Sequence, residues 1–504
     1  MVWTLLTIFL IASTVCSWGI ILFASKSKYS QLFFSDDQPH HTHTEQTSRI
    51  GGIGIIGGFA LSYVLFFILF DYRDNQSLMH FSVFIGALAC FTLGLVDDLK
   101  PIDAKLKLIL QIIIAIFAHE SGLSINRLII PFLEWDLDLQ NFSLILTIFW
   151  FVSIINLINL IDGLDGLAGG IGLMLMVLLI FLSLEKGVSI STFLSMGMAG
   201  AIIGFLIHNF PPARVYMGDS GAYTIGFVIA GLSLMNFQKG AVIAALLGPM
   251  MAMALPIIDV AFALLRRSLQ GLPLFRPDKG HIHHQLIRLG LSRKNTVLVL
   301  YGFSMLALLG GVLIFSYQGR YFPIFIGLAS VIIIVALRVY GNPALSLKQL
   351  FSDSYNTRYE TQNAILLARW MVGEVDRVRK GEDFWNEYQW FLKKLGFYRV
   401  SVQIDGEERI YAYAPEFLTE YSQFHVSERF VIDKPKGDNF IQFWGDKERF
   451  SERRFLLNCE IAFETWVSIC KRWRALNKEV YRFDGQAQKH SSEMIEKARN
   501  LYLP

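Results

Sequence analysis

Long apolar stretches dominate the first two thirds of the chain, in place of the short alternating patterns of a soluble fold. A helix that crosses a bilayer needs about 17 to 25 predominantly apolar residues. Eleven segments approach or meet this requirement, and each is predicted to be a membrane-spanning helix. They lie near residues 2–24, 51–70, 79–96, 105–120, 141–161, 168–184, 189–207, 219–236, 240–264, 296–316 and 321–340. The first lacks a basic segment and a small-residue cleavage site, so we expect a retained helix rather than a signal peptide.

Charge is distributed unevenly between two parts of the chain. Residues 1–340 hold 20 Lys and Arg and 18 Asp and Glu, whereas the much shorter remainder, 341–504, holds 25 and 24. The whole chain is 53% apolar and only 17% charged. We therefore predict an all-α polytopic membrane domain of about 11 transmembrane helices over residues 1–340, followed by a soluble α+β domain over 341–504. This division excludes a purely soluble enzyme.

The Lys and Arg residues between the spans predict the orientation of the membrane domain, because cytoplasmic loops carry an excess of them. The odd-numbered loops carry 14 and the even-numbered loops five. The odd loops should therefore face the cytoplasm, and with eleven spans the soluble tail lies there too. An even number of spans would place the tail outside.

Several classes of partner and site are excluded by composition and spacing. The net charge is close to zero in both parts and no basic run is present, which argues against nucleic acid. The chain has neither a P-loop motif nor a dinucleotide-binding glycine motif in a suitable context. The four cysteines lack the C-x-x-C spacing of zinc sites and are expected to be reduced. They are Cys16, Cys90, Cys459 and Cys470.

Acidic side chains gather on the odd-numbered loops and at the helix ends beside them. These acids are Asp97, Asp98, Asp162, Asp165 and Asp219, with Asn156, Asn159 and Asn209 nearby. A further odd loop carries Arg276, Lys279, His281, His283 and His284. Each motif alone also fits a solvated helix end or a simple turn. Together, oxygen ligands suited to Mg²⁺ and basic donors suited to phosphates indicate phosphoryl transfer involving a lipid.

Five motifs, in this order, resemble the polyprenyl-phosphate N-acetylhexosamine-1-phosphate transferase family, glycosyltransferase family 4, and in particular its undecaprenyl-phosphate GlcNAc-1-phosphate transferase-like branch. The motifs are HTEQTSRIGG (43–52), DDLK (97–100), NLINLIDGLDGL (156–167), MGDSGA (217–222) and GHIHH (280–284). The resemblance covers about residues 36–340. It implies transfer of a sugar-1-phosphate from a UDP-N-acetylhexosamine to undecaprenyl phosphate, with release of UMP, at the cytoplasmic face of the inner (plasma) membrane.

The resemblance also implies roles for individual residues. Asp97 and Asp98 match the acid pair linked to catalysis, and Asp219 and Asn159 match ligands of Mg²⁺, with Mn²⁺ as an alternative. The residues expected at the nucleotide are Asp165, Tyr216 and Asn209. Those expected at the phosphates and sugar are Lys100, Lys107, Asp162, Arg214, His281, His283 and His284. The first motif departs from the family, since the sequence around His41 and His43 lacks its Arg and Pro.

The form of the GHIHH motif bears on the donor. It is similar to members that start O-antigen, teichoic-acid or other envelope polysaccharides, which favours UDP-GlcNAc or a relative over the UDP-MurNAc-pentapeptide of the peptidoglycan branch. A non-catalytic transporter or scaffold is the alternative from another class, because acids within membranes also mark ion pathways. We expect direct in-line attack by the lipid phosphate, with a covalent aspartyl intermediate as the alternative. The expected partners are the two substrates and the lipid bilayer, and a homodimer is left open.

The soluble tail has its own strand and helix signals. A helix is predicted near 360–381, and a hairpin is predicted from VSVQI-DGEE-RIYAY, with its turn at Asp405 and Gly406. A second strand pair follows in FHVSERFVID and NFIQFWG, and then an amphipathic helix near 451–479. This order indicates a small α+β sensory or docking module, reminiscent of GAF-like domains. Five tryptophans are predicted to be core residues: Trp385, Trp390, Trp444, Trp466 and Trp473.

Overall fold

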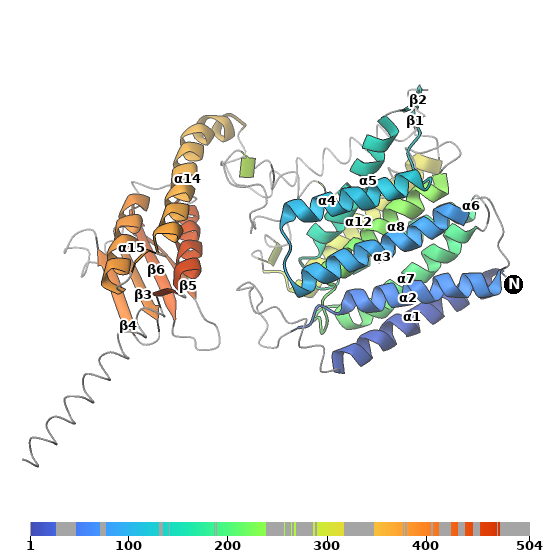
Figure 1. The fold of residues 1–504 in the computed structure, drawn as a ribbon, viewed down its shortest axis with the longest axis horizontal. Helices are drawn as coiled ribbons and strands as arrows, with labels where there is room; N and C mark the ends of the chain where they lie inside the picture. Colours follow the sequence, from blue (N-terminus) through green and yellow to red (C-terminus); the bar gives the residue numbers. More distant parts are fainter. Residues whose placement is uncertain are drawn as a thin grey trace, which may run out of the picture. The chain divides into compact units, whose positions relative to one another are not determined.

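The computed structural model of the 504-residue chain contains two compact units (Figure 1). The first comprises Met1–Leu264 and Pro277–Gly341, and the second comprises Leu265–Arg276 and Asn342–Pro504. The structure describes residues 2–26, 47–70, 77–130, 135–140, 142–185, 187, 189–237, 257, 264, 267–268, 286–287, 290–316, 347–375, 377–378, 381–404, 407–412, 425–431, 439–446, 454–470 and 472–473.

Long helices build the first unit. They are α1 (Val2–Lys26), α2 (Gly51–Leu69), α3 (Ser77–Leu99), α4 (Ala104–Glu120), α5 (Phe142–Ile161), α6 (Leu167–Glu185), α7 (Ile190–Asn209), α8 (Gly218–Phe237) and α12 (Arg293–Ser316). Within the described residues, six of them (α1, α2, α3, α5, α6 and α7) are long and apolar enough to cross a membrane. The total of eleven spans stays a prediction, since α4, α8 and α12 are not among these six, and 321–340 and nearly all of 240–264 lie outside the described residues.

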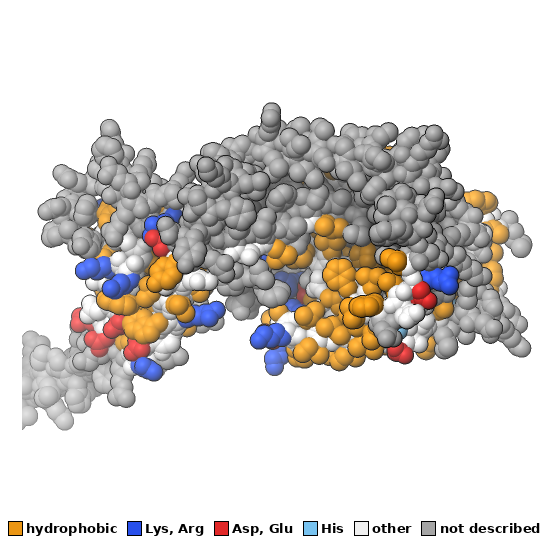
Figure 2. All heavy atoms as spheres, turned by 90° about the horizontal axis from the view of Figure 1, so that it is seen from above, with side chains coloured by type: hydrophobic (Ala, Val, Ile, Leu, Met, Phe, Trp, Pro, Cys, Tyr) orange, Lys and Arg blue, Asp and Glu red, His pale blue; other side chains and the backbone are white. Residues whose placement is uncertain are grey.

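The outward-facing side chains of these helices are themselves apolar. Phe23 on α1 is 81% exposed, Ile68 on α2 is 71% exposed and Phe149 on α5 is 66% exposed. In Figure 2 the first unit (right) shows a field of hydrophobic side chains, with charged ones gathered toward its two ends. A soluble protein rarely exposes such an area to water. The helices therefore indicate a multi-pass membrane protein.

Helix α8 lies at the centre of this unit, in contact with α2, α3, α5, α6 and α7. Its side chains are almost entirely buried, among them Tyr223 and Phe227. The close packing relies on glycine, because a Cβ at Gly226 would lie 2.7 Å from the Cα of Ile155 on α5. The first residues of α8 are consequently fixed in place by several neighbouring helices.

One element of the first unit contradicts the expectation that it is all-α. Strands β1 (Arg127–Ile130) and β2 (Trp135–Asp138) pair in antiparallel register between α4 and α5. The sequence carries a signal for β2, because Trp135, Asp136, Leu137 and Asp138 alternate between apolar and acidic residues. Such alternation has the period of two that is typical of strands.

The second unit is a four-stranded antiparallel sheet with helices. Its strands lie in the order β4-β3-β6-β5. The elements are α14 (Leu347–Val375), α15 (Gly381–Leu395), β3 (Arg399–Ile404), β4 (Glu407–Ala412), β5 (His425–Val431), β6 (Phe440–Asp446) and a helix over residues 454–470. Both predicted strand pairs are confirmed, although the turn residues Asp405 and Gly406 lie outside the described residues.

The prediction of a single helix before the hairpin is wrong, because α14 ends at Val375 and a separate helix, α15, follows. The apolar residues of α15 recur every three or four positions, which is the signal of an amphipathic helix. They include Phe384, Trp385, Tyr388, Phe391 and Leu392, all buried.

Aromatic side chains form much of the core of the second unit. Trp466 is fully buried against Phe384 and Tyr388, with ring centroids 6.0 and 4.7 Å away. Trp385, Trp444 and Trp473 are buried as well, which confirms their predicted role in the core. Trp390 does not follow the prediction, since it is 41% exposed beside Trp370.

Candidate active site

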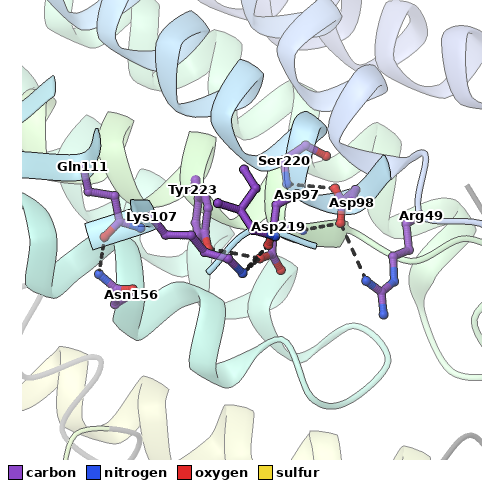
Figure 3. A network of polar contacts seen from close by, with 10 residues as sticks. Arg49, Asp97, Asp98, Lys107, Gln111, Asn156, Asp219, Ser220 and Tyr223 are labelled. Atoms are coloured by element: carbon purple, nitrogen blue, oxygen red, sulfur yellow. Dashed lines mark hydrogen bonds and ion pairs between the residues drawn. The ribbon is translucent and has the colours of Figure 1, made fainter. Parts of the chain in front are cut away.

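The adjacent acids at the end of α3 point to different partners, and the second of them caps α8 (Figure 3). The Asp98 carboxylate accepts hydrogen bonds from the backbone N–H groups of Asp219 and Ser220, each at 3.0 Å. Its side chain is fully buried, and Arg49 lies 3.9 Å from one of its oxygens. Amide groups at a helix N-terminus lack partners within the helix and favour a negative charge. Asp98 therefore stabilises the start of α8 from a neighbouring helix.

Two glycines make this contact sterically possible. A Cβ at Gly94, one turn before Asp98, would lie 2.4 Å from the backbone of Asp219 and Ser220. Gly218 has a positive φ of +74°, and a Cβ there would lie 2.5 Å from the Asp98 carboxylate. The glycine of the Met217-Gly218-Asp219 sequence is thus explained by both conformation and space.

Asp97 belongs to a second network, whose centre is Lys107 on α4 (Figure 3). One oxygen of Asp97 accepts a hydrogen bond from the backbone N–H of Ile102 at 2.7 Å, and the other is paired with the Lys107 ammonium. The same ammonium lies 3.5 Å from Asp219. Tyr223, one turn along α8, donates its hydroxyl to that Asp219 oxygen at 3.0 Å. Lys107 therefore holds two carboxylates from different helices close together.

The start of α2 packs against the segment that leads into α8. The backbone N–H groups of Gly51 and Gly52 donate to the carbonyls of Tyr216 and Met217, each at 3.0 Å. A Cβ at Gly52 would lie 2.3 Å from the Ser220 hydroxyl. The glycines of the first motif therefore allow α2 to approach the backbone of this segment closely.

The connection between α5 and α6 is fastened to the segment between α7 and α8. Asp165 accepts a hydrogen bond from the backbone N–H of Ala213 at 3.1 Å. The buried Asn209 side chain accepts from the N–H of Gly166 and donates to the carbonyl of Val215, both at 2.8 Å. The segments that contain Asp165 and Asn209, far apart in sequence, therefore meet in space.

The charges of the acids in this region shift the pKa values of neighbouring side chains. Burial raises the pKa of Asp162 well above its usual range, and the negative charges of Asp219 and Asp98 raise it further. Burial also raises the pKa of the Tyr216 hydroxyl, with the Asp165 charge as a second cause. Four acids from three motifs thus converge, and the structure brings Asp165 and Tyr216, both predicted at the nucleotide, into one neighbourhood.

The other predicted residues have varied surroundings. Lys100 and Arg214 are exposed, and Asn159 is half-buried on α5, its carbonyl accepting from the N–H of Asp162 at 3.2 Å. The histidines expected at the phosphates, sugar and first motif lie outside the described residues: His41, His43, His281, His283 and His284. The roles of His281, His283 and His284 at the phosphates and sugar stay predictions.

Three polar residues of this region were not singled out from the sequence. Arg49 faces Asp98, and Tyr223 holds Asp219. Gln111 on α4 accepts a hydrogen bond from Asn156 at 2.6 Å. Tyr223 and Gln111 each lie four residues after a predicted site residue, Asp219 and Lys107. Helical spacing of four places such pairs on one face and could have identified them.

The oxygen ligands of this region fit a hard divalent cation whose coordination is completed by the phosphates of a substrate. Within the described residues no group of three or more His, Cys, Asp or Glu side chains forms a ready metal site. Mg²⁺, however, is usually held by one or two carboxylates plus substrate phosphates. The excess negative charge around Asp162, from Asp219 and Asp98, is suited to such an ion.

Comparison with known proteins places this arrangement in a family. The glycosyl transferase family 4 model matches residues 80–236, which run from the first turn of α3 to the last turn of α8. A probable undecaprenyl-phosphate N-acetylglucosaminyl 1-phosphate transferase of Bacillus subtilis is 33% identical over 271 residues, which are 53% of this chain and 73% of the relative. The chain belongs to glycosyl transferase family 4.

Other relatives in this family act on polyprenyl phosphates by their names. The decaprenyl-phosphate N-acetylglucosaminephosphotransferase of Mycobacterium tuberculosis is 33% identical over 51% of this chain and 70% of the relative. The undecaprenyl-phosphate alpha-N-acetylglucosaminyl 1-phosphate transferase of Yersinia pestis is 26% identical over 54% and 75%. The resemblance inferred from the motifs is therefore confirmed. The family 4 match stops at residue 236, before α12 and the second unit.

Proposed function

We propose that the protein transfers an N-acetylhexosamine-1-phosphate from UDP-GlcNAc, or a related UDP-N-acetylhexosamine, to undecaprenyl phosphate and releases UMP. The reaction takes place at the cytoplasmic face of the inner membrane and starts O-antigen or another cell-envelope polysaccharide. Membership of family 4 and the names of three relatives support the reaction class. The observation that links this reaction to named residues is the position of Lys107 between Asp97 and Asp219, beside the start of α8.

The contacts of the acid pair favour direct attack by the lipid phosphate. Asp98 is a poor nucleophile, because both of its oxygens accept backbone hydrogen bonds and its side chain is buried. Both oxygens of Asp97 are also occupied, by the Lys107 ammonium and the N–H of Ile102, which suits a group that orients the acceptor. A phosphate monoester has a second pKa of about 6, so much of the acceptor is already a dianion at neutral pH. Proton removal is thus helpful rather than obligatory.

The proposed cofactor is Mg²⁺, with Mn²⁺ as an alternative. Asp219 and Asn159 are its proposed ligands, and Asp98 contributes negative charge nearby. When bound, the ion neutralises charge on the phosphates of the donor and of the leaving UMP. Lys107 adds positive charge from the chain itself, on the side of Asp219 that faces Asp97.

The first test is transfer of labelled phosphosugar from UDP-GlcNAc to undecaprenyl phosphate by the purified full-length chain, with and without Mg²⁺. We expect a Mg²⁺-dependent lipid product that Asp219→Asn lowers by at least about 100-fold, more than the loss of an outer-shell partner costs. The matched control is Asp103→Asn. Asp103 is exposed and caps α4 through the N–H of Lys105, a role in which Asn is about as good.

The donor and the alternatives are tested in the same assay. Turnover of UDP-MurNAc-pentapeptide alone would assign the chain to the peptidoglycan branch and reject the proposed donor. Failure with every UDP-N-acetylhexosamine, with and without Mg²⁺, would reject the transferase proposal in favour of a transporter or scaffold.

A further inference from the structure

A tyrosine on α12 contacts the connection between α5 and α6. The hydroxyl of Tyr301 donates a hydrogen bond to the carbonyl oxygen of Gly166 at 2.5 Å. The same carbonyl accepts the first-turn hydrogen bond of α6 from the N–H of Gly170 at 2.9 Å. Tyr301 therefore binds the exact point at which the Asp162–Gly166 segment becomes helix α6.

The chain leaves space for this ring. A Cβ at Gly170 would lie 1.9 Å from the Tyr301 hydroxyl oxygen and 2.0 Å from the ring carbon that bears it. Gly166 has a positive φ of +80°, and its Cβ would lie 3.5 Å from the same hydroxyl. Gly170 is thus explained by the presence of Tyr301, and Gly166 by its backbone conformation.

Gly166 is fixed from the opposite side as well. Its N–H donates to the buried side chain of Asn209, and the neighbouring Asp165 accepts from the N–H of Ala213. The segment before α8 therefore fixes one side of the peptide at Gly166, and Tyr301 fixes its carbonyl. Loss of the Tyr301 hydroxyl would leave the Gly166 carbonyl bonded to the N–H of Gly170 alone. The 162–166 segment could then rotate about the hydrogen bond between Gly166 and Asn209.

We propose that Tyr301 is a positioning residue for the nucleotide end of the UDP-sugar, acting through Gly166 on Asp165. This inference rests on the proposed function, in which Asp165 lies at the nucleotide, and it extends the site to α12, beyond the family match at residue 236. Tyr301 acts through the loop and does not contact the reacting phosphorus. Its removal should therefore weaken binding of the donor and leave use of the lipid acceptor unchanged.

The test compares Tyr301→Phe with wild type in the purified full-length chain. Dissociation constants for UDP are measured by titration calorimetry, and KM is measured separately for UDP-GlcNAc and undecaprenyl phosphate. We expect the dissociation constant for UDP and the KM for the donor to rise about two- to tenfold, as for the loss of one hydrogen bond. The KM for the acceptor and the midpoint of thermal unfolding should stay close to wild type. Tyr63→Phe is the matched control, since its hydroxyl contacts His80 between α2 and α3.

A second pair of variants moves the ring instead of removing the hydroxyl. Gly170→Ala must displace Tyr301 and should give the same rise in the dissociation constant for UDP. Gly302→Ala is its control, because a Cβ at Gly302 meets nothing within 4 Å.

The outcomes separate this inference from the proposed function. If wild type transfers the phosphosugar and Tyr301→Phe binds UDP as tightly as wild type, Tyr301 does not position the nucleotide and the proposed function stands. A fall in kcat and thermal stability without a change in UDP binding would give Tyr301 a purely structural role and overturn the inference. If wild type neither transfers from a UDP-sugar nor binds UDP, the proposed function fails and this inference fails with it.

Discussion

Asp98 on α3 accepts a hydrogen bond from the backbone N–H of Asp219 on α8, and so one acid of the cluster holds the backbone of another. The neighbouring Asp97 instead faces Lys107. Two adjacent carboxylates that look equivalent in the sequence therefore have different surroundings, one at a helix start and the other in a side-chain network. Substitutions of Asp97 and of Asp98 should therefore differ in how much they lower stability and how much they lower activity.

Asp98→Ala should lower both stability and activity, because it removes two acceptors from the buried start of α8. Loss of a helix cap costs about 0.5 to 2 kcal/mol, and the two amides would be left unpaired. Asp98→Asn keeps one acceptor and should lie between Asp98→Ala and wild type. Thermal unfolding in detergent and transfer activity are measured on the same samples. Full stability with abolished activity in Asp98→Ala would instead give Asp98 a direct part in the chemistry.

Gly94→Ala should damage the site without altering any polar group. The added Cβ would lie 2.4 Å from the backbone at Asp219 and Ser220, so α3 must move away from α8 and carry Asp98 with it. We expect a lower unfolding temperature and reduced transfer. Gly19→Ala on α1 is the control, since its Cβ meets nothing within 4 Å and alanine is the better helix former. Equal behaviour of the two variants would contradict the close packing of α3 on α8.

Lys107→Met should reduce transfer strongly, because it leaves Asp97 and Asp219 without their shared cation. Hydrogen bonds to charged groups contribute about 1.5 to 3 kcal/mol, which corresponds to about a 10- to 100-fold effect for one such contact. Lys105→Met on the same helix provides the comparison, because Lys105 is exposed. Steady-state rates at saturating substrates measure the difference. Similar rates for the two lysine variants would remove Lys107 from the proposed site.

The sequence predicts the helices of the first unit well because their signal is local. Spans near 51–70 and 141–161, for example, correspond to α2 (Gly51–Leu69) and α5 (Phe142–Ile161) within a residue. The β1–β2 hairpin and α15 were not predicted, although β2 alternates between apolar and acidic residues and α15 has the period of an amphipathic helix. Strongly apolar spans flank the hairpin, and clear strand signals follow α15.

The contacts of the site were much less predictable. The motifs identified Asp97, Asp98, Asp165 and Asp219 as a group, yet which acid caps α8 and which pairs with Lys107 depends on how α3 and α4 pack against α8. That packing is a relation between distant segments and leaves no periodic trace. Tyr301 is an extreme case. It contacts Gly166, which lies 135 positions earlier in the sequence, and its helix, α12, was predicted from hydropathy alone.

Tyr223→Phe should raise the Mg²⁺ concentration needed for half-maximal activity. The Tyr223 hydroxyl donates to the Asp219 oxygen that also faces Lys107, and so it fixes the orientation of a proposed ligand. Loss of an outer-shell partner of this kind costs about 10- to 100-fold in metal affinity or activity. The measurement is a Mg²⁺ titration of the initial rate, with Tyr63→Phe as control. An unchanged titration curve would mean that Asp219 keeps its orientation without Tyr223, or that it is not a ligand of the ion.

The second unit provides a test of whether the two units depend on each other. Trp466 is fully buried among Phe384, Tyr388 and Trp473, and truncation of a buried Trp costs about 3 to 5 kcal/mol. A unit of this size is stable by only about 5 to 15 kcal/mol, so Trp466→Ala should make it sensitive to limited proteolysis. Because the proposed chemistry resides wholly in the first unit, transfer of the phosphosugar should continue at close to the wild-type rate. Trp390→Ala, at an exposed position, controls for loss of a tryptophan as such. If proteolysis of the second unit is accompanied by loss of transfer in Trp466→Ala but not in Trp390→Ala, the second unit supports the reaction and is more than an appended module.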